Sequence, residues 1–234
     1  MSIRYFLFLI ILLASSPLFA QWNVGLKGGV NIMSINYDAR FNQRAIEQDF
    51  KMGYMGGFTF QYFNQPNIGL QIEALYIQKG FKTKFDTLNN LQYERSIDYL
   101  TMPMLMHTYI GKKRFNLSLL LGPYISYALS SNEKFTEDGN TTTQDYVWDR
   151  ERDNRFEFGL QAGIAFRNTF NFGILELEGM YTLGLTSIYK WGVVSTDPDK
   201  DKFFPIPEQV QHRGINITLS YYKTFGKIPE RLKD

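Results

Sequence analysis

The segment from Ile97 to Leu129 contains two long runs in which every second side chain is apolar, joined by the short basic turn GKKR. The apolar positions are Leu100, Met102, Met104, Met106 and Ile110 in the first run, and Phe115, Leu117, Leu119, Leu121, Ile125, Tyr127 and Leu129 in the second. Successive side chains of a β-strand point to opposite faces, so the pattern predicts a hairpin with one apolar and one mostly small or polar face. Each arm has about 13 residues, whereas soluble strands usually have five or six. Arms of this length are typical of strands that cross a bilayer at a tilt.

The N-terminus has the features of a secretory signal peptide. A short basic region, Met1–Arg4, precedes the apolar run YFLFLIILL, and Ala20 followed by Gln21 offers a cleavage site. The apolar run is too short to span about 30 Å of hydrocarbon as a helix. We therefore expect residues 1–20 to be a signal peptide and the mature chain to be exported.

The composition is compatible with a single β-barrel domain in a membrane. The chain has 234 residues, a net charge of +2 and no cysteine, and its mean hydropathy is -0.26. In a transmembrane barrel only every second residue faces lipid, so such a mean hydropathy does not exclude one. The small net charge gives no positive electrostatic field that would favour binding of nucleic acid. The absence of cysteine excludes a thiolate metal site or nucleophile. No cofactor is expected.

The same two-residue alternation recurs along the whole mature chain and predicts eight strands. These strands lie near residues 22–32, 51–62, 68–77, 97–110, 115–129, 155–166, 175–183 and 215–225. Long polar connections at residues 36–49, 82–96, 130–154 and 186–212 alternate with short turns at 64–67, 111–114 and 167–171. This asymmetry is typical of bacterial outer-membrane barrels with short periplasmic turns and long external loops. The sequence thus predicts an all-β, eight-stranded antiparallel up-and-down transmembrane barrel over residues 21–227, with a short polar tail at 228–234.

The hairpin also resembles a known family. The segment DYLTMPMLMHTYIGKKRFNLSLLLGPYISYAL is similar to the corresponding hairpin of PorT-like, porin-family outer-membrane β-barrel proteins of Gram-negative bacteria. Two further segments resemble that family, GLKGGVNIMSI (Gly25–Ile35) and EALYIQKGFK (Glu73–Lys82). The resemblance implies an eight-stranded barrel in the outer membrane, and its name-giving member belongs to the type IX secretion and gliding machinery. Thr101 stands where the family usually has Glu and His107 where it often has Lys, which places an ion pair expected there in doubt.

Charged residues also occur on the polar faces of the predicted strands, where they would point into the lumen. They are Lys27, Lys51, Glu73, Arg155, Glu157, Glu176 and Glu178. Such residues could line a pore, or they could form an internal network of ion pairs, since buried charges must be paired. Eight strands enclose an interior just wide enough for side chains to fill, which favours the network.

The sequence offers little for catalysis. Its two histidines, His107 and His212, are expected near opposite ends of the barrel. They therefore cannot share a site, and a barrel hydrolase would need a base beside a nucleophile or paired carboxylates at the rim. We expect the protein not to be an enzyme.

The predicted loops contain two candidate sites. Asp197, Asp199, Asp201 and Glu208 have the spacing of calcium ligands in an EF-hand, but Lys202 replaces the required glycine, so we expect a solvated loop. Aromatic residues among charges could contact envelope proteins or surface polymers, or could pack together and cap the barrel. The candidates for these contacts are Trp148, Tyr189, Trp191, Phe203 and Phe204.

Three functions fit these patterns. The favoured one is a non-enzymatic outer-membrane barrel, embedded in outer-membrane lipid, with an envelope structural or interaction role through its external loops. The second is a narrow pore or a component of a type IX-like secretion or gliding apparatus. The third is a soluble lipocalin-like carrier, whose apolar stripe would face inward around a ligand.

Overall fold

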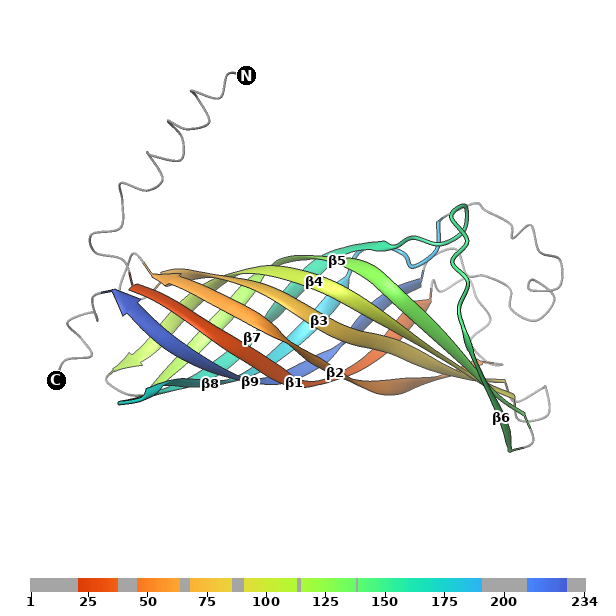
Figure 1. Ribbon diagram of the computed structural model, residues 1–234, viewed down its shortest axis with the longest axis horizontal. Coiled ribbons are helices and arrows are strands. Elements are labelled where there is room, and N and C mark those ends of the chain that lie inside the picture. Colours follow the sequence, from red (N-terminus) through yellow and green to blue (C-terminus); the bar gives the residue numbers. More distant parts are fainter. Residues whose placement is uncertain are drawn as a thin grey trace, which may run out of the picture.

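The computed structural model describes residues 21–37, 46–63, 68–85, 91–112, 115–137, 139–190 and 210–226. These residues form nine strands (Figure 1). The strands are β1 (Gln21–Tyr37), β2 (Ile46–Phe63), β3 (Ile68–Phe85), β4 (Leu91–Lys112), β5 (Phe115–Glu137), β6 (Asn140–Asp145), β7 (Phe156–Phe170), β8 (Gly173–Gly184) and β9 (Val210–Gly226). Within the described part of the chain, no helix is long and apolar enough to cross a membrane.

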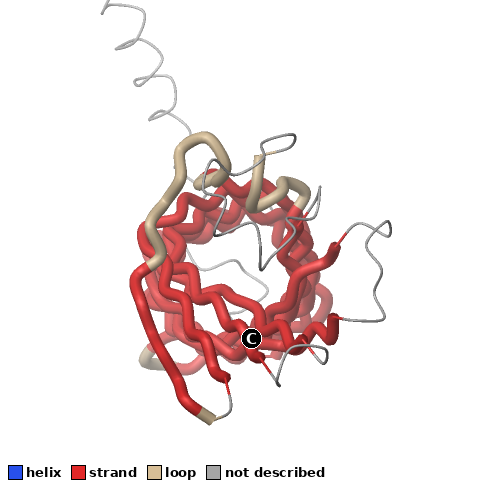
Figure 2. The backbone as a smooth tube through the Cα atoms, turned by 90° about the vertical axis from the view of Figure 1, so that its right-hand side faces the viewer, coloured by secondary structure: helices blue, strands red, loops and turns tan. Residues whose placement is uncertain are grey.

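Eight of the strands close into a ring of antiparallel pairs (Figure 2). The order around the ring is β1-β2-β3-β4-β5-β7-β8-β9, and the pairing of β9 with β1 completes it. The predicted eight-stranded antiparallel barrel is therefore confirmed. The ninth strand, β6, lies outside the ring and pairs with β5 alone.

The connections alternate between the two ends of the barrel. Residues 64–67, 113–114 and 171–172 join β2 to β3, β4 to β5 and β7 to β8, and the register of Gln21 with Gly226 places the barrel's first and last residues at that same end. We call this the turn end. The other end, which carries the connections from β1 to β2, β3 to β4, β5 to β7 and β8 to β9, is the loop end.

The wall of the barrel has its apolar side chains on the outside. Along β4 and β5, Met104 and Leu121 are 50% and 53% exposed, whereas the neighbouring Leu105 and Leu120 are 1% and 2% exposed. The other strands of the ring alternate in the same way, with large apolar residues exposed and mostly polar residues buried. This arrangement suits a barrel surrounded by lipid. It does not fit the lipocalin-like carrier, which requires the apolar stripe inside.

Several strands continue into segments that the sequence pattern had assigned to loops. The predicted loop at 82–96 is largely the paired ends of β3 and β4, and the predicted loop at 130–154 contains the end of β5 and all of β6. The strands also extend into the expected loops at 36–49 and 186–212, since β1 ends at Tyr37, β2 begins at Ile46 and β9 begins at Val210. The expectation failed because a strand that leaves the lipid needs no apolar residues on its outer face.

The extended strands form a sheet that continues beyond the barrel on one side of the ring, and we call it the protruding wall (Figure 1, lower right). Its outward positions are mainly polar, as at Lys82, Lys84 and Lys134. It consists of residues 46–50 of β2, 81–85 of β3, 91–97 of β4, 131–137 of β5 and the whole of β6.

Two irregularities shift the alternation near the base of the protruding wall. The register between β2 and β3 shifts between Phe50 and Met55, and that between β4 and β5 shifts at Asp98 and Tyr99. A bulge inserts one residue, so the inward and outward positions exchange beyond it. In β5 the inward positions are even-numbered up to Ala128, but the next buried residue is Ser131.

The outward apolar band predicts a position-dependent cost for a charge. We expect Leu121→Arg, in the middle of the lipid-facing part of β5, to lower the free energy of unfolding in lipid vesicles by about 2–4 kcal/mol, because arginine at the bilayer midplane is costly. Thr136→Arg, on the same strand within the protruding wall, is the matched control and should change it little. Equal effects of the two substitutions in urea titrations would contradict this placement of the bilayer.

Candidate functional site

A lysine and two glutamates meet in the middle of the lumen. Lys27 of β1 donates hydrogen bonds to Glu73 of β3 and to Glu178 of β8, the latter with 2.6 Å between Nζ and Oε2. All three side chains are buried. Three strands separate β3 from β8 in either direction around the ring, so the two glutamates come from opposite walls. Lys27 therefore braces the barrel across its full width.

A second cluster lies toward the turn end. The guanidinium of Arg167 on β7 pairs with Glu176, with 2.8 Å between Nε and Oε2, and donates hydrogen bonds to Gln61 of β2 and to Tyr109. Gln61 in turn donates to Glu176 at 3.0 Å. Because β2 and β7 also face each other across the ring, this cluster too spans the lumen.

A third cluster surrounds Glu157 toward the loop end. Its carboxylate binds the ammonium of Lys79 at 2.7 Å, Nδ1 of His212 at 2.9 Å and the hydroxyl of Tyr124 at 2.5 Å. The Lys79 ammonium also lies 4.8 and 4.7 Å from the ring centroids of Tyr99 and Tyr124. The residues of this cluster come from β3, β4, β5, β7 and β9, so the lumen is bridged at this level as well.

Glycines make room for two of the lumen aromatics. A Cβ added to Gly159 would lie 2.6 Å from the ring of Tyr124 and 2.3 Å from the backbone oxygen of Leu183. A Cβ on Gly25 would lie 2.7 Å from the ring of Tyr222. The rings can cross the lumen because these positions carry no side chain.

The structure brings together most of the charges that the sequence assigned to the lumen. Lys27, Glu73, Glu157, Glu176 and Glu178 are all buried there and all are paired. The glutamates pair with cations on other strands, and Lys27 pairs with carboxylates on β3 and β8. The arrangement can brace the barrel electrostatically and fill its lumen.

Two residues of the expected lumen network lie elsewhere. Gly80 lies between the inward-pointing Lys79 and Phe81, so its own Cα hydrogen side faces outward. The side chain of Lys51 lies against this outward side of Gly80 and reaches Ser96 and Glu94. Lys51 is therefore on the outer face of the wall. The shifted register of β2 between Phe50 and Met55 is the reason.

Arg155 also lies outside the network. It precedes the first residue of β7, and its guanidinium donates to the backbone oxygen of Leu129 and lies over the rings of Tyr127 and Trp148. The alternation of the strand does not extend to this position.

Sequence reasoning missed three buried cations on the strands of the ring: Lys79, Arg95 and Arg167. Lys79 continues the inward positions of Glu73 beyond the apparent end of its strand, and the other two fell in segments assigned to a loop or a turn. Extending the two-residue alternation through those segments would have found all three, because each shares the inward phase of its strand.

The two histidines lie in separate clusters, as expected. His107 is near Gln61, with 3.4 Å between Nδ1 and Nε2, and its Nε2 is 3.8 Å from the carboxylate of Glu176, whereas His212 binds Glu157. Each imidazole faces a carboxylate that a buried cation already holds.

The loop end is covered by chain segments around a buried arginine. The guanidinium carbon of Arg95 lies 3.6 Å from the ring centroid of Tyr146 and 5.4 Å from that of Trp148, and Nη1 donates to the hydroxyl of Tyr189 at 3.0 Å. Burial raises the pKa of the Tyr146 hydroxyl, which therefore keeps its proton and donates to Asp153 at 2.9 Å. These contacts fasten residues 146–154 and 185–190 over the opening.

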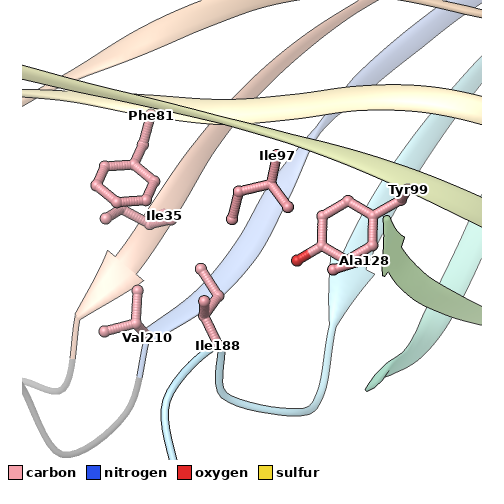
Figure 3. Close-up of a cluster of buried hydrophobic side chains, with 7 residues drawn as sticks. All are labelled: Ile35, Phe81, Ile97, Tyr99, Ala128, Ile188 and Val210. Carbon is pink, nitrogen blue, oxygen red and sulfur yellow. The ribbon is translucent and has the colours of Figure 1, made fainter. Parts of the chain in front are cut away.

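A cluster of apolar side chains lies beneath this cover (Figure 3). Trp148 and Tyr189, which were candidates for contacts with partners, pack against this cluster and around Arg95. For these two residues the capping alternative describes the structure better. The cluster consists of Ile35, Phe81, Ile97, Tyr99, Ala128, Ile188 and Val210.

The aromatic residues Trp191, Phe203 and Phe204 lie outside the described residues, as do the calcium-ligand candidates Asp197, Asp199, Asp201 and Glu208.

Residues 15–190 match the family model of the outer membrane protein beta-barrel domain. The chain belongs to this family. The family is that of outer-membrane barrels, which supports a place in the outer membrane and contact with its lipid. No curated protein sequence matches the chain significantly.

The chain is similar to several solved structures at low sequence identity. The outer membrane protein OprG from Pseudomonas aeruginosa is 13% identical with a TM-score of 0.50, over 90% of this chain and 98% of OprG. Ail, the attachment invasion locus protein of Yersinia pestis, is 12% identical with a TM-score of 0.40, over 87% of this chain and 98% of Ail. Neisserial surface protein A is 10% identical with a TM-score of 0.38, over 86% of this chain and 96% of that protein.

The central lysine of this family member provides a test of the lumen network. We expect Lys27→Met to lower the free energy of unfolding by about 3–5 kcal/mol, because it leaves two buried carboxylates without their cation. The triple variant Lys27→Met/Glu73→Gln/Glu178→Gln removes the uncompensated charges and should recover much of the loss. Urea titration in lipid vesicles measures both, and a single variant as stable as the native protein would refute the bracing role of Lys27.

Proposed function

We propose that this protein is a non-enzymatic, non-conducting outer-membrane barrel that acts through the surface at its loop end. The signal peptide predicted at residues 1–20 belongs to this proposal, since it would deliver the chain to the envelope. The observation that carries the proposal is the bracing of the lumen by Lys27, which binds glutamates from opposite walls.

The filled lumen argues against transport along the barrel axis. Hydrogen-bonded clusters cross the lumen at three levels, around Arg167, Lys27 and Glu157. A passing ion would have to displace a buried charge from its partner, which costs several kcal/mol. The barrel is thus built as a rigid support.

The loop end is the side suited to contacts. On that side the protruding wall extends past the apolar band, and its β5–β6 hairpin stands clear of the ring (Figure 2). Loops and extensions on a rigid scaffold commonly carry binding functions. We propose envelope proteins or surface polymers as partners, in addition to outer-membrane lipid around the barrel.

A second candidate follows from the PorT-like resemblance of the β4–β5 hairpin, which supports a place in a type IX-like secretion or gliding apparatus. In that role the barrel would be a structural component that contacts other subunits. A narrow pore is the less favoured form of this alternative because of the braced lumen.

Planar-bilayer recordings test the closed lumen. We expect the purified barrel to give no stable single-channel currents. A variant with Lys27, Glu73 and Glu178 all changed to alanine removes the central brace and should give small currents if folded. Regular ohmic steps from the native protein would overturn the proposal of a non-conducting barrel.

Crosslinking on intact cells tests the interaction role. Because the native chain has no cysteine, single cysteines can carry a photoreactive group at Thr141 in β6 and at Phe170 at the turn end. We expect adducts with envelope proteins or polymers at Thr141 and none at Phe170. Adducts at Phe170 alone would contradict a function located at the loop end.

A further inference from the structure

Among the described residues, no strand pairs with the second edge of β6. This strand pairs with β5 from Asn140 to Asp145, and it ends the strand order of the sheet. All six of its side chains are exposed. An edge of this kind presents a row of backbone N–H and C=O groups that another extended chain can pair with.

The register shows which residues face this open edge. The backbone N–H of Tyr146 donates to the oxygen of Ser131 at 2.8 Å, which makes that pair a hydrogen-bonded one. Hydrogen-bonded and non-hydrogen-bonded pairs alternate along an antiparallel ladder. Thr142 and Gln144 therefore bond to β5, whereas Thr141, Thr143 and Asp145 direct their backbone groups away from it.

The edge lacks three of the usual protections against pairing. Natural edge strands are commonly blocked by lysine, proline or a bulge, but β6 has the sequence NTTTQD and pairs with β5 in an unbroken register. Threonine favours extended strands. The edge is therefore suited to accept a strand.

The hairpin that carries the edge is held in place before any partner arrives. Gln144 donates to Glu133 at 2.6 Å, Tyr93 of β4 donates to Glu133 at 3.2 Å, and the rings of Tyr93 and Phe135 lie 5.1 Å apart. Because β4 supports the hairpin from the barrel side, a partner strand would pay little to order it.

The charge of the hairpin specifies the kind of strand. Its described residues include three carboxylates, Glu133, Glu137 and Asp145, against one ammonium, Lys134. Asp145 lies on β6 itself and would face the added strand, and Glu133 and Glu137 lie one strand further away on β5. Opposite charges on neighbouring strands stabilise a sheet, and like charges destabilise it. An incoming strand rich in lysine or arginine is favoured.

We propose that the open edge of β6 binds an extended basic segment of another protein by adding it as a further strand of the protruding wall. This inference rests on the proposed function of the loop end and names its partner by chemistry. The added strand would form backbone hydrogen bonds with Thr141, Thr143 and Asp145. The acidic side chains of the hairpin would favour basic side chains on that strand.

The probe for this proposal is a fluorescent seven-residue peptide that alternates lysine and threonine, titrated against the mature barrel in nanodiscs. Thr143→Pro removes an N–H on the open edge but none of the bonds to β5, because proline is tolerated at edge positions facing solvent. We expect the peptide to bind the native barrel and to bind the Thr143→Pro variant about tenfold or more weakly. Thr143→Ala is the matched control and should bind like the native protein.

Two further readouts identify the binding mode. Amide hydrogen exchange should show Thr142 and Gln144 protected in the native barrel and in Thr143→Pro, which establishes that the hairpin stays folded. Addition of the peptide should protect Thr141 and Asp145. A peptide with glutamate in place of lysine should bind more weakly, by the charge argument above.

The result that overturns this inference is a native barrel that does not bind the peptide, or a Thr143→Pro variant that binds it equally. Cell-surface crosslinks at other loop-end positions, such as Lys190, would then leave the proposed function standing without the strand addition. Absence of crosslinks at any loop-end position would remove both.

Discussion

The ion pairs of Lys27 with Glu73 and Glu178 follow from a constraint that the whole barrel obeys. A ring of eight strands leaves no room for water-filled space between its walls, so every inward charge must find a partner on another strand. Lys27 does this across the full width of the ring, and Arg167 and Glu157 do so nearer its two ends. The inner face is therefore polar and fixed, and the outer face is left free to match the lipid. Removing one partner leaves the other as a buried, unpaired charge, which lowers the free energy of unfolding. The contributions of these residues to stability therefore depend on one another.

Much of this arrangement could be predicted from the sequence because a single alternation specifies both faces. The parity that puts Leu119 and Leu121 into lipid also puts Glu157, Glu176 and Glu178 into the lumen, and the structure agrees. The prediction failed where a bulge interrupts the alternation or where the outward residues of a strand are not apolar. Lys51 lies beside the irregular register of β2, so its side chain crosses to the outer face. Arg95 lies in the protruding part of β4, where the outward residues are polar, so the apolar pattern did not identify that segment as a strand.

The same reasoning separates what binds lipid from what can bind a partner. Within the lipid the outer face must be apolar, and this requirement makes the strands easy to recognise and chemically uniform. Beyond it the protruding wall carries lysines, glutamates and threonines, and a strand with an open edge. Its inner side is occupied by Tyr146, Trp148 and Tyr189 around Arg95, so those aromatic residues stabilise the cover and leave the outer margin for recognition. Membership in the outer membrane protein beta-barrel domain family accounts for the barrel.

The pairing of β1 with β9 has a kinetic consequence. It joins the first strand of the barrel to the last, from Gln21 with Gly226 to Tyr37 with Val210, so the ring is completed by a contact of the greatest possible sequence separation. Contacts of this kind form slowly because a long stretch of chain must be ordered first. Lys27 lies on β1, and Glu178 on β8, which is β9's other neighbour. The central brace can therefore form only as the barrel shuts, and until that moment a lysine and two glutamates face a partly open interior that water can still enter. The ion pairs of Lys27 therefore stabilise the closed barrel but do not contribute to the steps that precede closure.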